Sequence, residues 1–425
     1  MADQQVSRRR RTQFSAAAAA LLVVGTACAA EEEPQQATDA EDQTENSDDD
    51  ATAEQETEGT EDSDSSETDE EDDSEAEDPD VEEPPDFPES NTTTFEHTET
   101  ISEPVITPKS VVANGRGLAI ANNMMYQHSV TIYDTETGEL VQELDDTINP
   151  GALGVEGYPD NVEGAPVEAV WTEDGQHAYV SQYRLGDLGA TAYDDCRNGE
   201  DVAPSGVFRY SVEDQDWDQF IEVGRVPKYQ ALTPDESRLL VTNWCDFDLS
   251  VIDTETGEEE MRVPLNSQPR GIAAMPDNRT VYVTAMYANE LWKVDLETGE
   301  GEVIYNEAQF PRHLVLSPDA ETLYVTFSRS DLLVAFDTET DEVIGSTSTG
   351  REPRTMDISA DGTALYVVNY YEDSVSKFDA ETLEEIDRRD TGHLPIGVSY
   401  DAMTGSVWVA NYSGSLSIYD DTVSR

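Results

Sequence analysis

Five basic residues each stand directly after a proline, and their types and spacing suit the binding of an anion. They are Lys109, Lys228, Arg270, Arg312 and Arg354. The last four recur at intervals of 42 residues, so a repeating fold would bring them to equivalent positions. Converging Lys and Arg side chains hold an anion through charge-assisted, fork-like hydrogen bonds. We therefore predict a ligand-binding site at these five residues. The alternative is that each cation pairs with an acid of the adjoining repeat and only locks the repeats together.

The five cations stand in a strongly acidic chain. The 425 residues contain 93 Asp and Glu against 24 Lys and Arg, for a formal net charge of −69. From residue 91 onward, 62 acids face 20 bases. Nucleic-acid binding depends on neutralising many phosphates, so this charge excludes nucleic acid as a partner. A small anion, or a protein at the cell surface, is the partner that we expect.

Histidines offer a second, weaker site. His128, His313 and His393 are expected on the same face of the fold as the cations, and three imidazoles are a possible zinc ligand set. Isolated histidines on loops are more often ordinary hydrogen-bonding residues. We therefore predict no metal and no other cofactor. The chain contains no nucleophile elbow, metalloprotease helix, P-loop or dinucleotide fingerprint, and we assign no catalytic residue.

The elements that must position these residues form a repeat array. Segments beginning at residues 240, 282, 324, 366 and 408 read Leu/Tyr/Trp-Val-Thr/Val/Ala-Asn or a close variant, 42 residues apart. A proline lies 13 residues before each start, and an Asp lies 13 after the first four. Extending this template upstream adds two units with insertions near 146–164 and 183–204. The total is seven units.

Each unit is predicted to contain four short strands. In residues 311–350, β-branched and apolar runs alternate with Pro, Asp and Gly turns, which is typical of strands and hairpins. The same turns leave no room for the helices of an α-solenoid. A four-stranded unit of about 40 residues is a propeller blade. The fold class is therefore all-β: a seven-bladed β-propeller of four-stranded antiparallel blades.

The ends of the array predict how the ring closes. Only four residues follow Asp421, so the seventh unit holds three strands and must borrow its fourth. Residues 93–106 are rich in β-branched residues and would supply it, with Phe95 and Ile101 on one face. Closing the ring with this N-terminal strand removes two exposed sheet edges.

These repeats resemble the YVTN-type β-propeller family, in its exported or surface lipoprotein form. Residues 269–273 read Pro-Arg-Gly-Ile-Ala, 240–243 read Leu-Val-Thr-Asn, and 251–257 read Val-Ile-Asp-Thr-Glu-Thr-Gly. The resemblance covers about residues 95–421 and implies a fold rather than an activity. Lactonases and quinoproteins with the same architecture place one or two functional residues per blade around the channel. A lactonase-like hydrolase or a metal-dependent oxidoreductase therefore remains the alternative to a binding module, as does an inert structural protein.

The N-terminus is predicted to direct export. Four arginines at 8–11 precede an apolar run at 14–27 that is too short to span a bilayer, and small residues lead to Cys28. We predict a signal peptide at 1–28 that ends at a lipobox-like, lipidated Cys28; an ordinary small residue beside a simple cleavage site is the alternative. Residues 29–92 are predicted to be an acidic disordered linker, and residues 93–425 the propeller.

Cys196 lies in the second insertion and Cys245 in the equivalent loop of the next unit, so the two are neighbours on one face. In an oxidising compartment we expect them to form a disulfide; the alternative is a buried thiol at Cys245 beside Trp244. Altogether, the sequence predicts an exported, membrane-anchored β-propeller that binds a small anion and is monomeric. Its contact with the membrane is made only through the N-terminal lipid.

Overall fold

The protein is described by a computed structural model that covers residues 87–103, 106–124, 128–186, 196 and 202–422. The predicted signal peptide, Cys28 and nearly all of the acidic linker lie outside these residues. Within them, no helix combines the length and hydropathy that crossing a bilayer requires.

Seven four-stranded antiparallel sheets make up the described fold. Blade 1 consists of β2 (Pro108–Ala113), β3 (Leu118–Asn123), β4 (Ser129–Asp134) and β5 (Leu140–Asp145). Blade 2 consists of β8 (Pro166–Trp171), β9 (His177–Gln182), β10 (Ser205–Ser211) and β11 (Asp216–Val223). Blade 3 consists of β12 (Pro227–Leu232), β13 (Arg238–Asn243), β14 (Asp248–Asp253) and β15 (Glu259–Pro264). Blade 4 consists of β16 (Pro269–Ala274), β17 (Thr280–Ala285), β18 (Glu290–Asp295) and β19 (Glu300–Tyr305).

The last three blades continue the pattern. Blade 5 consists of β20 (Pro311–Leu316), β21 (Thr322–Phe327), β22 (Leu332–Asp337) and β23 (Val343–Ser348). Blade 6 consists of β24 (Pro353–Ile358), β25 (Ala364–Asn369), β26 (Ser374–Asp379) and β27 (Glu385–Asp390). Blade 7 consists of β28 (Pro395–Asp401), β29 (Ser406–Asn411), β30 (Ser415–Asp420) and β1 (Glu96–Ile101). The first insertion contains β6 (Thr147–Ile148), the 3-10 turn η1 (Pro150–Leu153) and β7 (Val162–Glu163), and a second such turn, η3, spans Met286–Ala288.

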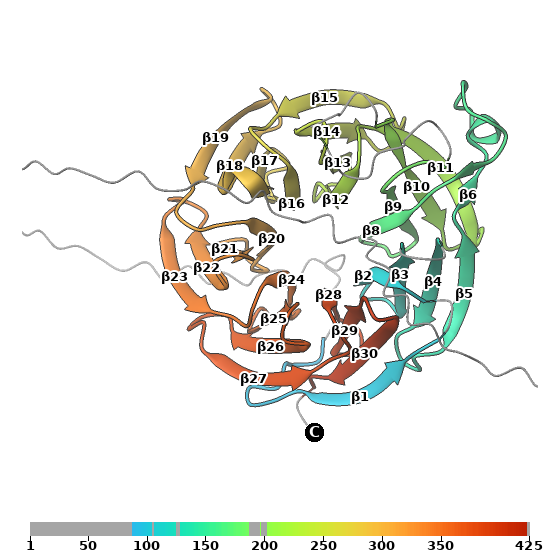
Figure 1. Cartoon of the computed structure of the whole chain (residues 1–425). Helices are drawn as coiled ribbons and strands as arrows, with labels where there is room; N and C mark the ends of the chain where they lie inside the picture. Colours follow the sequence, from blue (N-terminus) through green and yellow to red (C-terminus); the bar gives the residue numbers. More distant parts are fainter. Residues whose placement is uncertain (1–86, 104–105, 125–127, 187–195, 197–201, 423–425) are drawn as a thin grey trace, which may run out of the picture. The chain divides into compact units, whose positions relative to one another are not determined.

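The blades form a closed ring around one axis, and this confirms the predicted seven-bladed propeller (Figure 1). The first strand of each blade is innermost and contacts the first strands of the two neighbouring blades, including β2 with β28 at the closure. Any residue of an innermost strand that points inward therefore faces the same axis.

Burial between neighbouring blades explains why the second strand of each unit is apolar at successive positions. β17 is buried at all but its first residue, because adjacent blades cover both of its faces. The recurring tyrosine of this strand reaches into the next blades. The Tyr282 hydroxyl donates to Asp341 Oδ1 at 2.9 Å, and the Tyr324 hydroxyl donates to the Ala380 carbonyl at 3.0 Å. The tyrosine of the repeat thus links blades as well as filling the core.

The recurring asparagine at the end of the second strand organises the adjacent hairpin. Asn369 is fully buried, and its Nδ2 donates to Ser374 Oγ at 3.1 Å and Ser376 Oγ at 2.8 Å. Blade 5 has Phe327 at this position, directly opposite Leu332. The asparagine of blade 6 therefore pairs with hydroxyl groups of the third strand, whereas Phe327 of blade 5 faces an apolar partner.

The N-terminal strand closes the ring as predicted, but one detail of that prediction is wrong. β1 pairs antiparallel with β30 and completes blade 7. Phe95 packs with Tyr366 and Tyr419 toward blade 6, whereas Ile101 packs with Leu416 in the cluster toward blade 1. The two residues lie on opposite faces because the register shifts between His97 and Glu99, and such a bulge reverses the alternation.

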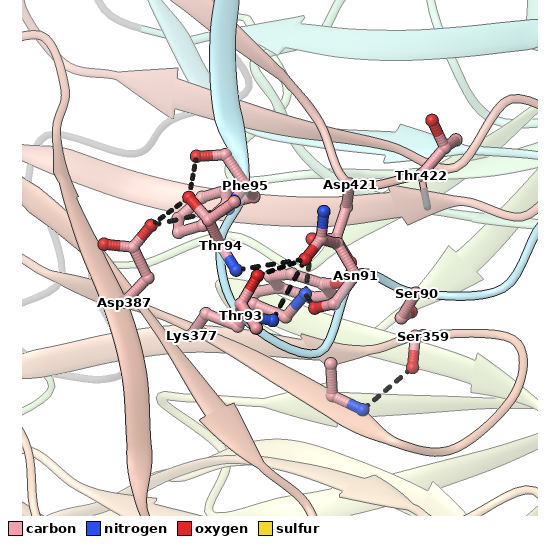
Figure 2. A network of polar contacts seen from close by, with 12 residues as sticks. Ser90, Asn91, Thr93, Thr94, Phe95, Ser359, Lys377, Asp387, Asp421 and Thr422 are labelled. Atoms are coloured by element: carbon pink, nitrogen blue, oxygen red, sulfur yellow. Dashed lines mark hydrogen bonds and ion pairs between the residues drawn. The ribbon is translucent and has the colours of Figure 1, made fainter. Parts of the chain in front are cut away.

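A buried polar network joins the start of the described chain to its end (Figure 2). Lys377 and Asp421 are both fully buried and form an ion pair, and the Lys377 ammonium also donates to the Asn91 carbonyl. Tyr366 donates its hydroxyl proton to the same carboxylate of Asp421. The Asn91 N–H donates to the Asp421 carbonyl at 2.8 Å. The two ends of the fold are therefore fastened to blade 6 as well as to each other.

Candidate anion-binding site

The site is positioned by one backbone feature that all seven blades share. Each innermost strand begins at its proline, where the missing N–H costs no ladder bond. The register with the second strand then shifts just after that proline in every blade. A bulge re-aims the side chain that it contains. The residue after the proline is therefore presented at one end of the axis in each blade.

Lys109, Lys228, Arg270, Arg312 and Arg354 occupy five of these seven positions, and we call them the cation cluster. Val167 and Ile396 occupy the other two. All five side chains are buried in the structure, with exposed fractions of 2% to 8%. The charged groups are therefore shielded from bulk water, which strengthens any electrostatic interaction that they make.

Aromatic and thioether side chains contact Lys228, Arg270, Arg312 and Arg354 of the cation cluster. They come from the position just after each second strand. Lys228 Nζ lies 4.7 Å from the ring centroid of Tyr183 and 5.0 Å from that of Trp244. Arg354 Cζ lies 4.0 Å from the ring centroid of Tyr370. Such cation–π contacts stabilise a partly desolvated cation. Sequence reasoning missed this layer, although the residue after each second strand reads as a periodic signal: Met124, Tyr183, Trp244, Met286, Ser328, Tyr370 and Tyr412.

Acids accompany the cations but do not follow a single pattern. Lys109 Nζ lies 3.6 Å from Glu168 Oε1 of the next blade. This is the kind of pairing expected if the cations only lock adjoining blades together. Arg354 instead pairs with Glu352, which directly precedes its own strand. Lys228, Arg270 and Arg312 also have interaction partners in the structure. Pairing between blades therefore explains part of the cluster.

The cations are close enough to raise one another's electrostatic potential. Burial lowers the pKa of Lys109 to about 7; Glu168 opposes this, while Arg270, Arg312 and Lys228 lower it further. Burial also lowers the pKa of His313 to about 3, and Arg270, Arg312 and Lys109 add to that effect. An anion placed among these groups would therefore meet a positive potential, although the chain as a whole is strongly negative.

A second layer of polar groups, which sequence reasoning missed apart from His313, follows two residues after the proline. Glu168, Tyr229 and His313 belong to this layer, in blades 2, 3 and 5. His313 Nε2 lies 3.0 Å from the Tyr229 hydroxyl. Burial raises the pKa of Glu168, and Lys109 opposes that rise. Period-two alternation counted from each proline would have found the layer, which reads Ser110, Glu168, Tyr229, Gly271, His313, Thr355 and Gly397.

The structure does not bring the three candidate histidine ligands together. His128 Nδ1 lies 3.5 Å from Asp146, and His393 Nδ1 lies 3.0 Å from Asp373. His313 lies in the second polar layer with Tyr229. Among the described residues, no group of three or more His, Cys, Asp or Glu side chains has the arrangement of a metal site.

Cys196 and Cys245 are joined by a disulfide beside the cation cluster. Cys245 packs in a small cluster with Trp244, Val226 and Met286. Trp244 in turn contacts Lys228 and Arg270. The bond therefore fastens the loop that carries one of the aromatic covers.

The chain enters four of the innermost strands through an uncommon backbone conformation. Val226, Phe310, Glu352 and Leu394 each precede the proline and have φ between 55° and 59°. This left-handed region is rare for residues with a Cβ and rarest for β-branched ones. Strained positions of this kind persist where surrounding packing holds them, and they occur often near binding sites.

Comparison with known proteins agrees with the fold. A family model described as a YNCE-like beta-propeller matches residues 212–385. Among solved structures, the Kuenenia stuttgartiensis hydrazine synthase matches with a TM-score of 0.58 and 17% identity, covering 75% of this chain and 96% of that chain. No curated protein matches the chain. A likeness at this level of identity concerns the propeller architecture.

Proposed function

We propose that this protein is an exported binding module that captures a small anion at the cation cluster. The observation that carries the proposal is that five buried basic residues occupy one equivalent position of the innermost strands, in a chain with 93 acids and 24 bases. Equivalent positions of a propeller converge on the axis, and Arg270, Arg312 and Lys228 lie close enough to Lys109 to lower its pKa. A bound anion would offset the cost of holding them there.

The size of the ligand follows from the charge of the whole chain and the burial of the cation cluster. The overall charge of −69 repels large polyanions at long range. Long-range repulsion is screened beyond roughly 10 Å at 0.1 M salt, whereas buried charges are screened much less. A small anion can therefore approach and then bind locally, while an extended polyanion meets acid along most of its length.

Export and membrane attachment belong to the same proposal. The disulfide between Cys196 and Cys245 supports an oxidising compartment. The arginines at 8–11, the apolar run and Cys28 support a lipid anchor at the N-terminus. Replacing Cys28 with Ala should move the protein from the membrane fraction to the soluble fraction of the cells that export it. Unchanged membrane association would contradict the anchor.

Thermal melts with a panel of small anions test the binding site. The test variant is Arg270→Gln, Arg312→Gln and Arg354→Gln together, and the matched control replaces the surface-paired Arg238, Arg279 and Arg388 with Gln. Acetate, phosphate or sulfate should raise the melting temperature of the wild type and the control by a few degrees, and should leave that of the test variant unchanged.

The same melts distinguish binding from structural pairing. If the arginines serve only to lock blades together, the test variant should melt clearly lower without any ligand, because their acidic partners stay buried and unpaired. If they bind an anion, relief of repulsion within the cluster should offset the loss of the Arg354–Glu352 pair, and the melting temperature without ligand should change little. A variant that melts lower and keeps the full anion response would reject the site.

An enzyme using the same end of the axis is the second candidate, and one residue favours it. Asp357 lies on β24, accepts the Tyr400 N–H at 2.8 Å, and burial raises its pKa to about 6. A carboxylate that titrates near neutral pH suits a general base in hydrolysis. Hydrolysis of simple lactones by the wild type, lost in Asp357→Asn, would establish this reading. Equal background rates in both proteins would reject it.

A further inference from the structure

Two side chains from blades that are not neighbours meet just below the cation cluster. Tyr229 belongs to β12 in blade 3, and His313 belongs to β20 in blade 5. Their rings lie 5.0 Å apart between centroids at an interplanar angle of 87°, and His313 Nε2 lies 3.0 Å from the Tyr229 hydroxyl. The pair therefore reaches past blade 4 on the axial side.

Gly271 makes this contact possible, because it holds the equivalent position in blade 4. A Cβ on Gly271 would lie 2.8 Å from the Arg312 carbonyl oxygen and 3.2 Å from His313 Cα. Blade 4 therefore presents no side chain at this level, and its strand packs close against β20. The space that a side chain would have filled is left to Tyr229 and His313.

The hydrogen bonds of His313 define which way its proton points. The Met356 N–H donates to His313 Nδ1 at 3.4 Å, so Nδ1 carries no proton. Its pKa of about 3, lowered by burial and by the nearby arginines, keeps the ring neutral at ordinary pH. The one imidazole proton is therefore on Nε2 and is donated to the Tyr229 oxygen. The hydroxyl proton of Tyr229 is then available to another acceptor.

The next layer down the axis sets a limit on the length of the ligand. Two residues further along the innermost strands, the half-buried side chains are mainly apolar. They are Val112, Val170, Ala231 and Val315. Asp357 and Ser399 also belong to this layer, but they accept the backbone N–H groups of Tyr400 and Ala113. Below Tyr229 a ligand therefore meets mainly apolar side chains, together with two polar groups that are already bonded to the backbone.

We propose that Tyr229 donates a hydrogen bond to the ligand, and that the ligand is a short carboxylic acid with a second oxygen beside the carboxylate, such as a 2-hydroxy acid. This inference rests on the proposed function, because the carboxylate is held by the cation cluster. The second oxygen then points down the axis and accepts the Tyr229 proton. His313 acts as a positioning residue, since its Nε2–H orients the tyrosine hydroxyl.

Calorimetric binding of lactate and propionate to the full-length protein tests this inference. The two acids differ at the 2-position by one hydroxyl, so their affinity ratio reports the added hydrogen bond. The wild type should bind lactate about tenfold more tightly than propionate. In Tyr229→Phe the ratio should fall to about one to twofold, with propionate binding retained. In His313→Gln the ratio should fall as well, because the hydroxyl loses its orienting donor.

The matched control is Tyr158→Phe. This variant removes a tyrosine hydroxyl that lies away from the axis and donates a 2.7 Å hydrogen bond to Glu222 Oε1. It should keep the full ratio. If Tyr229→Phe also keeps the ratio while both acids bind, the role of Tyr229 is rejected and the anion site stands. If neither acid binds the wild type, but phosphate or sulfate does, the ligand class is rejected. If no anion binds at all, the proposed function and this inference both fail.

Discussion

At the scale of single residues, Lys109 connects the charge of the site to pH. Its pKa of about 7 results from burial beside Arg270, Arg312 and Lys228, with Glu168 opposing. The cluster therefore loses one positive charge as the pH rises through about 7. A bound anion favours the protonated form, so binding and proton uptake by this lysine are linked.

We predict that the affinity for a small anion falls as the pH rises through about 7, by up to about tenfold, because Lys109 loses its charge there. The measurement is sulfate affinity by calorimetry between pH 6 and pH 9, where sulfate itself does not titrate. Lys109→Gln should bind more weakly at pH 6 and show little change with pH. A pH profile of the wild type that stays flat would contradict this prediction.

Lys109 changes the stability of the fold with pH in the direction opposite to that of an ordinary paired lysine, whose folded-state pKa is raised. The folded-state pKa lies below the unfolded value of 10.5, so the unfolded chain binds more protons between about pH 7 and 10.5. Without ligand, this group therefore makes the fold more stable as the pH rises through that window, and unfolding of Lys109→Gln should lack that slope.

The five cations were predictable from the sequence, but their surroundings were not. Their position follows a proline in every unit, and the bulge after that proline is the same in each blade. Tyr183, Trp244 and Tyr370 stand at one recurring position of the repeat, but that they cover the cations depends on side-chain packing between blades. The contact between Tyr229 and His313 requires a residue without a side chain, Gly271, in the blade between them. Counting from the prolines places the three residues at one level, but it does not show that Tyr229 and His313 touch across blade 4.

At the scale of elements, the repeat predicted the blades well because each second strand carries the same burial requirement. The strand that closes the ring stands outside the repeat, and there the prediction went partly wrong. Alternation placed Phe95 and Ile101 on one face, but the bulge between His97 and Glu99 turns them toward different blades. A one-residue bulge among exposed polar residues leaves almost no sequence signal.

The loop disulfide provides the prediction that belongs to this scale. Cys196 and Cys245 should be bonded in the exported protein, and mass spectrometry with alkylation before and after reduction measures it. The bond closes a loop with a sequence separation of 49 residues. On the chain-entropy account this gives about 4 kcal/mol of stabilisation at most. Both thiols being alkylated without reduction would show that the bond is absent.

At the scale of the whole molecule, stability should depend on the closing strand and little on the acidic segment before it. We predict that deleting residues 93–106 lowers the melting temperature markedly, because blade 7 loses β1 and β30 becomes an open edge. Deleting residues 31–88 should change the melt little, since its composition predicts no core. Equal melting temperatures for the two deletions would contradict closure by β1.

The buried ion pair between Lys377 and Asp421 at the closure should also contribute to the free energy of unfolding. Replacing Lys377 with Met leaves Asp421 buried without its charge partner, at a cost of roughly 3–5 kcal/mol in the free energy of unfolding. The double variant Lys377→Met with Asp421→Asn should recover part of that loss. Urea unfolding of both variants measures it. A single variant as stable as the wild type would mean that the network in Figure 2 does not hold the ends.

The central claim is that the cation cluster holds an anion on the propeller axis. The most direct measurement is an anomalous difference map from crystals of the protein grown without phosphate or sulfate and soaked in selenate. We predict that the strongest selenium peak lies about 3–4 Å from the charged groups of at least two of Lys109, Lys228, Arg270, Arg312 and Arg354. Selenium peaks found only on the outer surface of the blades, with none at the cluster, would contradict the claim.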